Sequence, residues 1–236
     1  MLKALPRADL QSSLCSLFFS LLLLSSVLFL CFFFDSLCVR VDTGHVLPWN
    51  TKQTGLARTG RRLACDHVNV RPDILVLGKA LSGGVYPVSA VLCDDEVMMQ
   101  IKPGEHGSTY GGNPLGSAVA MAALRVIEEE GLADRAERMG QLFRGEIQSI
   151  IDEDQLCPML KEVRGKGLLN AIVIDEFEGR NGEILDAMDV CLALRHNGLL
   201  AKPTHGDIIR LAPPLVLTEA QLQESVDIIR GTLQEM

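Results

Sequence analysis

The 236-residue chain lacks several features that would assign it to common functional classes. Its seven cysteines form no C-x-x-C pair and their number is odd, so neither a zinc site nor a disulfide framework is supported. The five histidines are isolated from one another, and no metal site is predicted. Basic residues number 22 against 30 acidic ones. The net charge of -8 argues against nucleic acid as a partner, because phosphate contacts need clustered lysine and arginine.

Charge is missing altogether from residues 14–34, a run of 21 residues that holds six of the eight phenylalanines. This length suits a helix that crosses a bilayer. A signal peptide is a second interpretation, although the usual apolar core has about 7–15 residues. A third is that residues 1–50 form a segment foreign to the domain that follows. Membrane contact is therefore expected only through residues 14–34.

From residue 51 onward, apolar runs alternate with helical patterns, which predicts an α/β fold. The expected strands are 74–77, 88–92, 160–164, 168–174, 199–201 and 208–211. The expected helices are a short one ending near residue 100, then 113–130, 133–152, 184–196 and 218–234. Thr218 and Gln221 form a capping box that starts the last of these. A break near Gly131 predicts part of a larger domain over 51–132 and a small α+β domain over 133–236.

Lys79 directly follows the apolar strand 74–77 and Gly78, at a strand end where α/β proteins commonly bind ligands. Apolar neighbours disfavour the charged form of such a lysine, and a neutral amine can form a Schiff base with an aldehyde. An ordinary surface lysine is the alternative on position alone. A P-loop is excluded, because it would need glycine at Asp73 and a hydroxyl at Ala80.

Several sequence blocks resemble the class III, fold-type I aminotransferases, which use pyridoxal 5'-phosphate (PLP). They are Q-T-G-L-A-R-T-G at 53–60, P-D-I at 72–74, G-K-A-L-S-G-G at 78–84 and H-G-S-T-Y-G-G-N-P at 106–114. Within that class, V-R-G-K-G-L-L-N at 163–170 and the block 199–210 are similar to the ornithine aminotransferase branch. The resemblance covers residues 53–236. It implies part of a PLP-binding large domain with a mostly parallel sheet, followed by the small domain.

The resemblance implies roles for five side chains. Lys79 would bind PLP as a Schiff base and then move a proton between substrate and cofactor. Gln53 would hydrogen-bond the phenolic oxygen of the PLP ring. Ser108 and Thr109 would reach the PLP phosphate of the neighbouring subunit, so a homodimer or higher oligomer is expected; hydroxyls in a glycine-rich turn suit a phosphate. Arg210 would bind the substrate α-carboxylate through its planar guanidinium. Without the resemblance, a polar turn and a surface ion pair are the alternatives.

The implied activity is transfer of the δ-amino group of ornithine to 2-oxoglutarate, which yields glutamate semialdehyde and glutamate. A class III enzyme for another ω-amino acid is one alternative. A non-catalytic fragment, tethered to a membrane or dimerising with a longer enzyme, is the other. The family implies the mitochondrial matrix, but no arginine- and serine-rich transit peptide is visible in this N-terminus.

One position departs from the family pattern. Three residues before the glutamine matched by Gln53, the family has an aspartate that keeps the pyridine nitrogen protonated, whereas this chain has Asn50. The family's upstream phosphate-binding turn, the aromatic ring that stacks on PLP and most of the substrate pocket are also not found. Part of a sheet would then expose apolar faces and an unpaired edge. We therefore expect this chain alone to be inactive as a transaminase.

Overall fold

The computed structural model describes residues 48–50, 54–153 and 157–236, and these form two compact units. The first contains residues 48–50 and Asn69–Leu124, and the second contains Thr54–Val68 and Arg125–Met236. The chain therefore leaves the first unit after residue 53, returns to it at Asn69, and leaves it again inside helix α3 (Pro114–Glu129). The domains expected at 51–132 and 133–236 stay a prediction.

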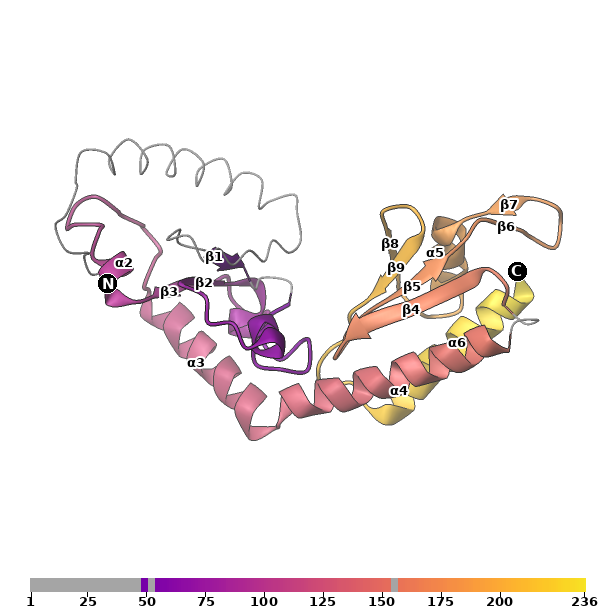
Figure 1. The fold of residues 1–236 in the computed structure, drawn as a ribbon, viewed down its shortest axis with the longest axis horizontal. Helices are drawn as coiled ribbons and strands as arrows, with labels where there is room; N and C mark the ends of the chain where they lie inside the picture. Colours follow the sequence, from indigo (N-terminus) through magenta and orange to yellow (C-terminus); the bar gives the residue numbers. More distant parts are fainter. Residues whose placement is uncertain (1–47, 51–53, 154–156) are drawn as a thin grey trace. The chain divides into compact units, whose positions relative to one another are not determined.

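The first unit is built on a three-stranded sheet (Figure 1). Its order is β1 (Pro48–Asn50), β2 (Ile74–Leu77) and β3 (Ala90–Cys93), with β1 parallel and β3 antiparallel to β2. The 3-10 helix η2 (Lys79–Ser82) follows β2, and the short helix α2 (Asp95–Met98) follows β3. The strand expected at 88–92 is shifted to 90–93. Because β2 ends at Leu77, where η2 is about to begin, pairing stops at the Leu77–Ala90 pair.

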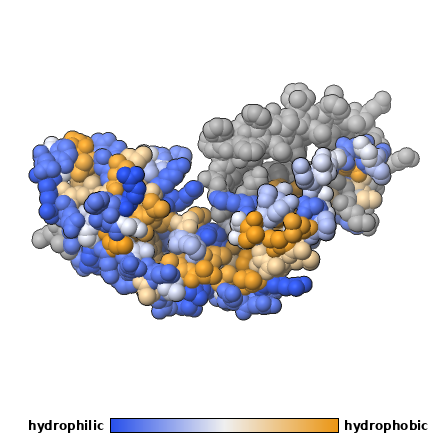
Figure 2. Space-filling model, turned by 180° about the vertical axis from the view of Figure 1, so that it is seen from behind, coloured by the Kyte–Doolittle hydropathy of each residue, from blue (hydrophilic) through white to orange (hydrophobic). Residues whose placement is uncertain are grey.

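Apolar side chains of this unit lie near the surface. All four residues of β2 are only half-buried, and Val91 and Leu92 of β3 are 52% and 48% exposed. Figure 2 shows apolar side chains on the surface over α3, where Leu115 and Met121 are exposed. Among the described residues, the buried apolar side chains of this unit are Leu81 and Ala120. The exposed apolar surface expected of a partial sheet is present.

The second unit has an antiparallel sheet of order β4-β5-β9-β8, a small hairpin and three helices (Figure 1). The strands of the sheet are β4 (Leu160–Lys166), β5 (Leu169–Ile174), β9 (Ile208–Leu211) and β8 (Lys202–Thr204). The hairpin joins β6 (Phe177–Glu178) to β7 (Ile184–Leu185), and a 3-10 turn, η1, covers Ala64–Val68. The helices are α4 (Leu132–Asp152), α5 (Ala187–His196) and α6 (Glu219–Glu235).

A single hydrophobic core holds the second unit together. Alternate residues of β5 are buried, so one face of the strand lies against the helices. In α4 and α6 the buried residues recur every three or four positions, which gives each helix one apolar face. The core residues of these two helices include Met139, Phe143, Ile147, Ile150, Leu222, Val226, Ile229 and Leu233.

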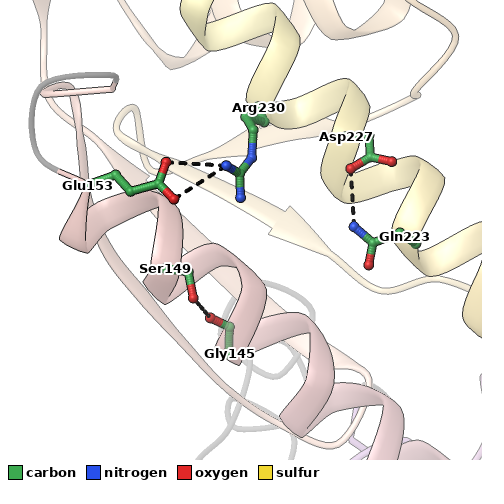
Figure 3. Close-up of polar contacts among 6 residues, drawn as sticks. All are labelled: Gly145, Ser149, Glu153, Gln223, Asp227 and Arg230. Carbon is green, nitrogen blue, oxygen red and sulfur yellow. Dashed lines mark hydrogen bonds and ion pairs between the residues drawn. The ribbon is translucent and has the colours of Figure 1, made fainter.

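Polar side chains of α4 and α6 form hydrogen bonds and an ion pair at the surface, beside the contact between the two helices (Figure 3). Arg230 of α6 donates from Nη1 to both carboxylate oxygens of Glu153, at 3.5 and 3.2 Å. The neighbouring Cys157 is buried, and its burial raises the pKa of the thiol, an effect that Arg230 opposes and Glu153 reinforces. The helix ends are thereby joined through side chains as well as through the core.

Two further expected elements have different bounds, and the two ends of helix α5 explain them. The helix expected from 184 begins at Ala187, because the Asp186 side chain accepts hydrogen bonds from the N–H groups of Met188 and Asp189 and caps it. The strand expected at 199–201 lies at Lys202–Thr204 instead, because the Leu199 N–H still bonds the last turn of α5, at 2.8 Å. Helices 133–152 and 218–234 were predicted within one residue of α4 and α6.

Across the described ranges, no helix is both long and apolar enough to cross a membrane. Residues 14–34, where the sequence raised that possibility, lie outside these ranges.

Candidate functional site

Lys79 lies where β2 ends and η2 begins, and its backbone is unusual. Its φ is +52°, in the left-handed region that residues with a side chain rarely adopt. Such backbone conformations concentrate at functional sites. The Lys79 side chain is exposed, so the desolvation expected for it is not found in this unit. The sequence could not show that the turn after β2 directs this residue to solvent.

The turn that carries Lys79 is anchored by its other side chains. Leu81 and Ser82 are 5% and 2% exposed. The Ser82 hydroxyl donates to the carbonyl of Tyr86 and accepts from the Tyr86 N–H at 3.2 Å. Gly83 closes the turn with a φ of +64° and donates to the Ala80 carbonyl at 2.9 Å. The G-K-A-L-S-G-G block is therefore held in place by Leu81 and Ser82, while the Lys79 side chain is exposed to solvent.

Asn50 belongs to the same sheet. It ends β1, and its backbone pairs in register with Val76, three residues before Lys79. The fold thus brings this strand position beside β2, which ends two residues before the lysine. Gln53, three residues further along, lies outside the described residues.

Ser108 and Thr109 lie on an exposed turn before α3. The Ser108 hydroxyl accepts the Gly111 N–H at 2.9 Å, which shapes the turn. Asn113 then caps α3: its side-chain oxygen accepts the Gly116 N–H at 2.7 Å, and its amide donates to the Tyr110 carbonyl at 2.8 Å. The turn offers hydroxyl groups at a solvent-exposed glycine-rich segment, which is the chemistry that a phosphate requires.

Arg210 is in the second unit. It lies in the middle of β9, paired with Ala171 of β5 and Lys202 of β8. Its side chain is exposed, whereas its neighbour Ile209 is 0% exposed, because successive side chains of a strand point to opposite faces. Arg210 therefore lies on the sheet face away from the core.

These residue types fit an aldehyde cofactor that carries a phosphate. Lys79 supplies an accessible primary amine, Ser108 and Thr109 supply hydroxyls, and Arg210 supplies a guanidinium for a carboxylate. Lys79, Ser108 and Thr109 belong to the first unit and Arg210 to the second.

Sequence reasoning assigned no role to Arg58, which the structure places among main-chain carbonyls of the second unit. The signal that could have drawn attention to it is the pair Gly60 and Gly167. These two glycines lie so close that a side chain at Gly167 would collide with the backbone of the Arg58–Gly60 segment.

Comparison with known proteins places these features in a family. Residues 51–233 match the model of the aminotransferase class-III family. The chain is 64% identical to a mitochondrial ornithine aminotransferase of Rattus norvegicus over 181 residues, which is 77% of this chain and 39% of that protein. The chain thus spans about two fifths of that relative.

Solved structures agree. An ornithine aminotransferase from Toxoplasma gondii, described with partial occupancy of PLP at its active site, superposes with a TM-score of 0.73 at 47% identity. The match covers 80% of this chain and 43% of that one. An acetylornithine aminotransferase from Elizabethkingia anophelis gives a TM-score of 0.71 at 58% identity, over 79% and 47% of the two chains. The PLP-dependent fold-type I architecture implied by the sequence is therefore confirmed.

Proposed function

Because this chain belongs to the class III aminotransferase family, we propose that it supplies the cofactor-binding lysine and a substrate-binding arginine of an ornithine δ-aminotransferase. What supports the proposal is the match of residues 51–233 to the class III family, together with the place of Lys79 at the end of β2 on a left-handed, anchored backbone. The 64% identity to a mitochondrial ornithine aminotransferase supports ornithine and 2-oxoglutarate as substrates and the mitochondrion as the compartment.

Five residues of this chain would bind the cofactor or the substrate. PLP, when bound, supplies an electron sink for the substrate. The ε-amino group of Lys79 would hold the cofactor and, once released, would move a proton at the δ-carbon of ornithine. Arg210 would bind the substrate α-carboxylate, and Gln53 would bind the phenolic oxygen of the cofactor. Ser108 and Thr109 would bind the cofactor phosphate of a second subunit, which makes the proposed assembly a dimer or larger.

A second candidate function is that of a non-catalytic partner for a longer class III chain. Two observations favour it. Asn50 stands where the family carries an aspartate, and an amide cannot supply the negative charge that keeps the cofactor nitrogen protonated. The half-buried β2 and the exposed Val91 and Leu92 of β3 leave apolar surface that a larger sheet would cover.

Borohydride trapping tests whether Lys79 binds the cofactor. The full chain is incubated with PLP, reduced, digested and mapped by mass spectrometry, with Lys79→Ala and, as a matched control, Lys102→Ala from an exposed loop. We expect a phosphopyridoxyl adduct on Lys79 that Lys79→Ala abolishes and Lys102→Ala leaves unchanged. An adduct scattered over several lysines would contradict a cofactor site at Lys79.

Turnover of ornithine by the same preparations completes the test. A Lys79 adduct with turnover supports the enzyme. A Lys79 adduct without turnover supports the non-catalytic partner. In that case Asn50→Asp, which returns the carboxylate, is expected to restore measurable turnover only if the ring charge is the missing element.

A further inference from the structure

The segment that follows Gln53 is held firmly on the second unit. Residues Leu56, Ala57 and Thr59 are 5%, 0% and 4% exposed, and Ala57 has a left-handed φ of +64°. The Ala57 N–H donates to the Arg62 carbonyl at 3.1 Å, which closes the loop. A loop this buried and this tightly turned does not bend freely, so it can serve as a fixed support for other elements.

Arg58 connects this loop to the start of β5 and to the chain after β9, the strand that carries Arg210. Its carbonyl accepts the Leu168 N–H at 2.9 Å, and its Nη1 donates back to the Leu168 carbonyl at 3.2 Å. The same Nη1 donates to the carbonyl of Pro213. Leu168 directly precedes β5 and Pro213 lies two residues after β9, so one guanidinium links the adjacent ends of two paired strands.

The guanidinium is half-buried, and burial lowers its pKa because the charged form loses water. From this place it donates to two main-chain carbonyls, one before β5 and one after β9, so its hydrogen bonds hold these two chain segments together.

A second arginine, Arg144, also contacts the turn between β4 and β5, but it does not contact the chain after β9. Arg144 of α4 donates from Nη1 to the Gly167 carbonyl at 3.1 Å and to the Asn170 side-chain oxygen at 2.7 Å. Asn170 is 3% exposed and pairs with Leu211, the neighbour of Arg210. Arg144 thus supports the β4–β5 turn from the helix side, whereas Arg58 alone of the two also bonds the chain after β9. This difference supplies a matched control.

From these contacts we infer that Arg58 is a positioning residue for Arg210: it fixes the end of β9 against β5 and so sets where the Arg210 guanidinium meets a substrate carboxylate. The inference rests on the proposed role of Arg210. Arg58 itself contacts main-chain carbonyls and acts through the strand. Pro213 is three residues from Arg210, which in an extended strand is about 10 Å of chain.

The test measures carboxylate binding directly. The full chain, labelled with ¹⁵N-arginine, is titrated with ornithine and with 1,4-diaminobutane, which is ornithine without its α-carboxylate. The Arg210 side-chain signal, identified by its loss in Arg210→Met, reports binding. We expect Arg58→Met to weaken ornithine binding about tenfold, as for one charge-assisted hydrogen bond. 1,4-Diaminobutane, which lacks the carboxylate, should not shift the Arg210 signal in any variant that keeps Arg210. Arg58→Lys, which keeps the charge but not the fork, should show a smaller loss.

Arg144→Met is the control for stability, since it loosens the same turn without touching Pro213. It should bind ornithine like the parent chain. Equal weakening by Arg144→Met and Arg58→Met, or no weakening by Arg58→Lys and Arg58→Met, would overturn the inference. If Arg58→Met does not fold, judged by circular dichroism, Arg58→Lys decides alone. An Arg210 signal that ornithine does not shift in the parent chain would remove the premise, whatever borohydride trapping at Lys79 shows.

Discussion

Gly140 and Gly145 belong to the same helix, α4, but have different surroundings. A methyl group at Gly140 would overlap the Gly167 carbonyl and come within 2.9 Å of the Arg144 guanidinium, whereas one at Gly145 would meet nothing within 4 Å. Gly140 is buried and Gly145 is exposed. Only the first glycine is therefore required by packing.

We predict that Gly140→Ala destabilises the chain by about 1–3 kcal/mol, because α4 must move away from the β4–β5 turn. Gly145→Ala should stabilise it by about 0.5–1 kcal/mol, since alanine restricts the unfolded helix segment. Urea unfolding followed by far-UV circular dichroism measures both. Similar effects for the two substitutions would show that α4 does not approach the turn this closely.

The sequence predicted individual residues unevenly. Lys79 was recognisable because it directly follows an apolar strand, and strand ends are local features. The exposure of its side chain was not, because it depends on the direction of the η2 turn. Arg58 was missed because its carbonyl partners lie 110 and 155 residues further along the chain. Contacts over such separations leave no periodic pattern in the sequence.

At the scale of elements, α4 and α6 meet through a core and through an ion pair at its edge (Figure 3). Ile229 is 0% exposed, whereas the side chains of Arg230 and Glu153 are 32% and 44% exposed. The adjacent residues Ile229 and Arg230 therefore allow the contribution of the core and that of the ion pair to be measured separately.

Ile229→Ala is expected to lower the free energy of unfolding by about 2–5 kcal/mol through loss of buried surface and the cavity left behind. Arg230→Met should lower it by less than about 1 kcal/mol, because a half-exposed ion pair contributes little. The same urea titration compares them. In addition, Arg230→Met should raise the pKa of the Cys157 thiol, because Arg230 now lowers it. A loss of stability from Arg230→Met as large as that from Ile229→Ala would refute this ranking.

Element types were predicted best where the signals are local. The capping box at Thr218 and the apolar spacing of α4 located two helices closely. The error at residues 184–185 arose because Ile184 and Leu185 continue the apolar spacing of α5, although they pair with β6. Whether two residues form a short strand depends on the strand that they pair with, and the periodicity of the local sequence gives no information about that partner.

At the scale of the whole chain, the two units differ in how much apolar surface they bury. The core cluster of buried residues lies entirely within the second unit, from Ala136 to Leu233. The sheet of the first unit has half-buried strands. The sequence predicted an α/β chain with partly uncovered sheet faces, but it did not predict that Thr54–Val68 belongs to the second unit, because that assignment depends on the distant partners of Arg58.

Amide hydrogen exchange should therefore separate the units. We expect β2 and β3 to exchange at least about 100-fold faster than β5 and α6, because local opening costs less where few apolar contacts are buried. Mass spectrometry of peptides covering 74–93, 169–174 and 222–233 measures this. Equal protection of all three would mean that the units open together.

The second unit is made of two separate chain segments, Thr54–Val68 and Arg125–Met236, and the ribosome synthesises the first of them long before the second is complete. Arg58 leaves the ribosome 110 residues before Leu168 and 155 residues before Pro213. At about 5–20 residues per second, the Thr54–Val68 loop waits roughly 5 to 30 s for the strands that it binds. During that interval the loop lacks both of the segments that Arg58 contacts, and α6, which follows Pro213, is synthesised later still.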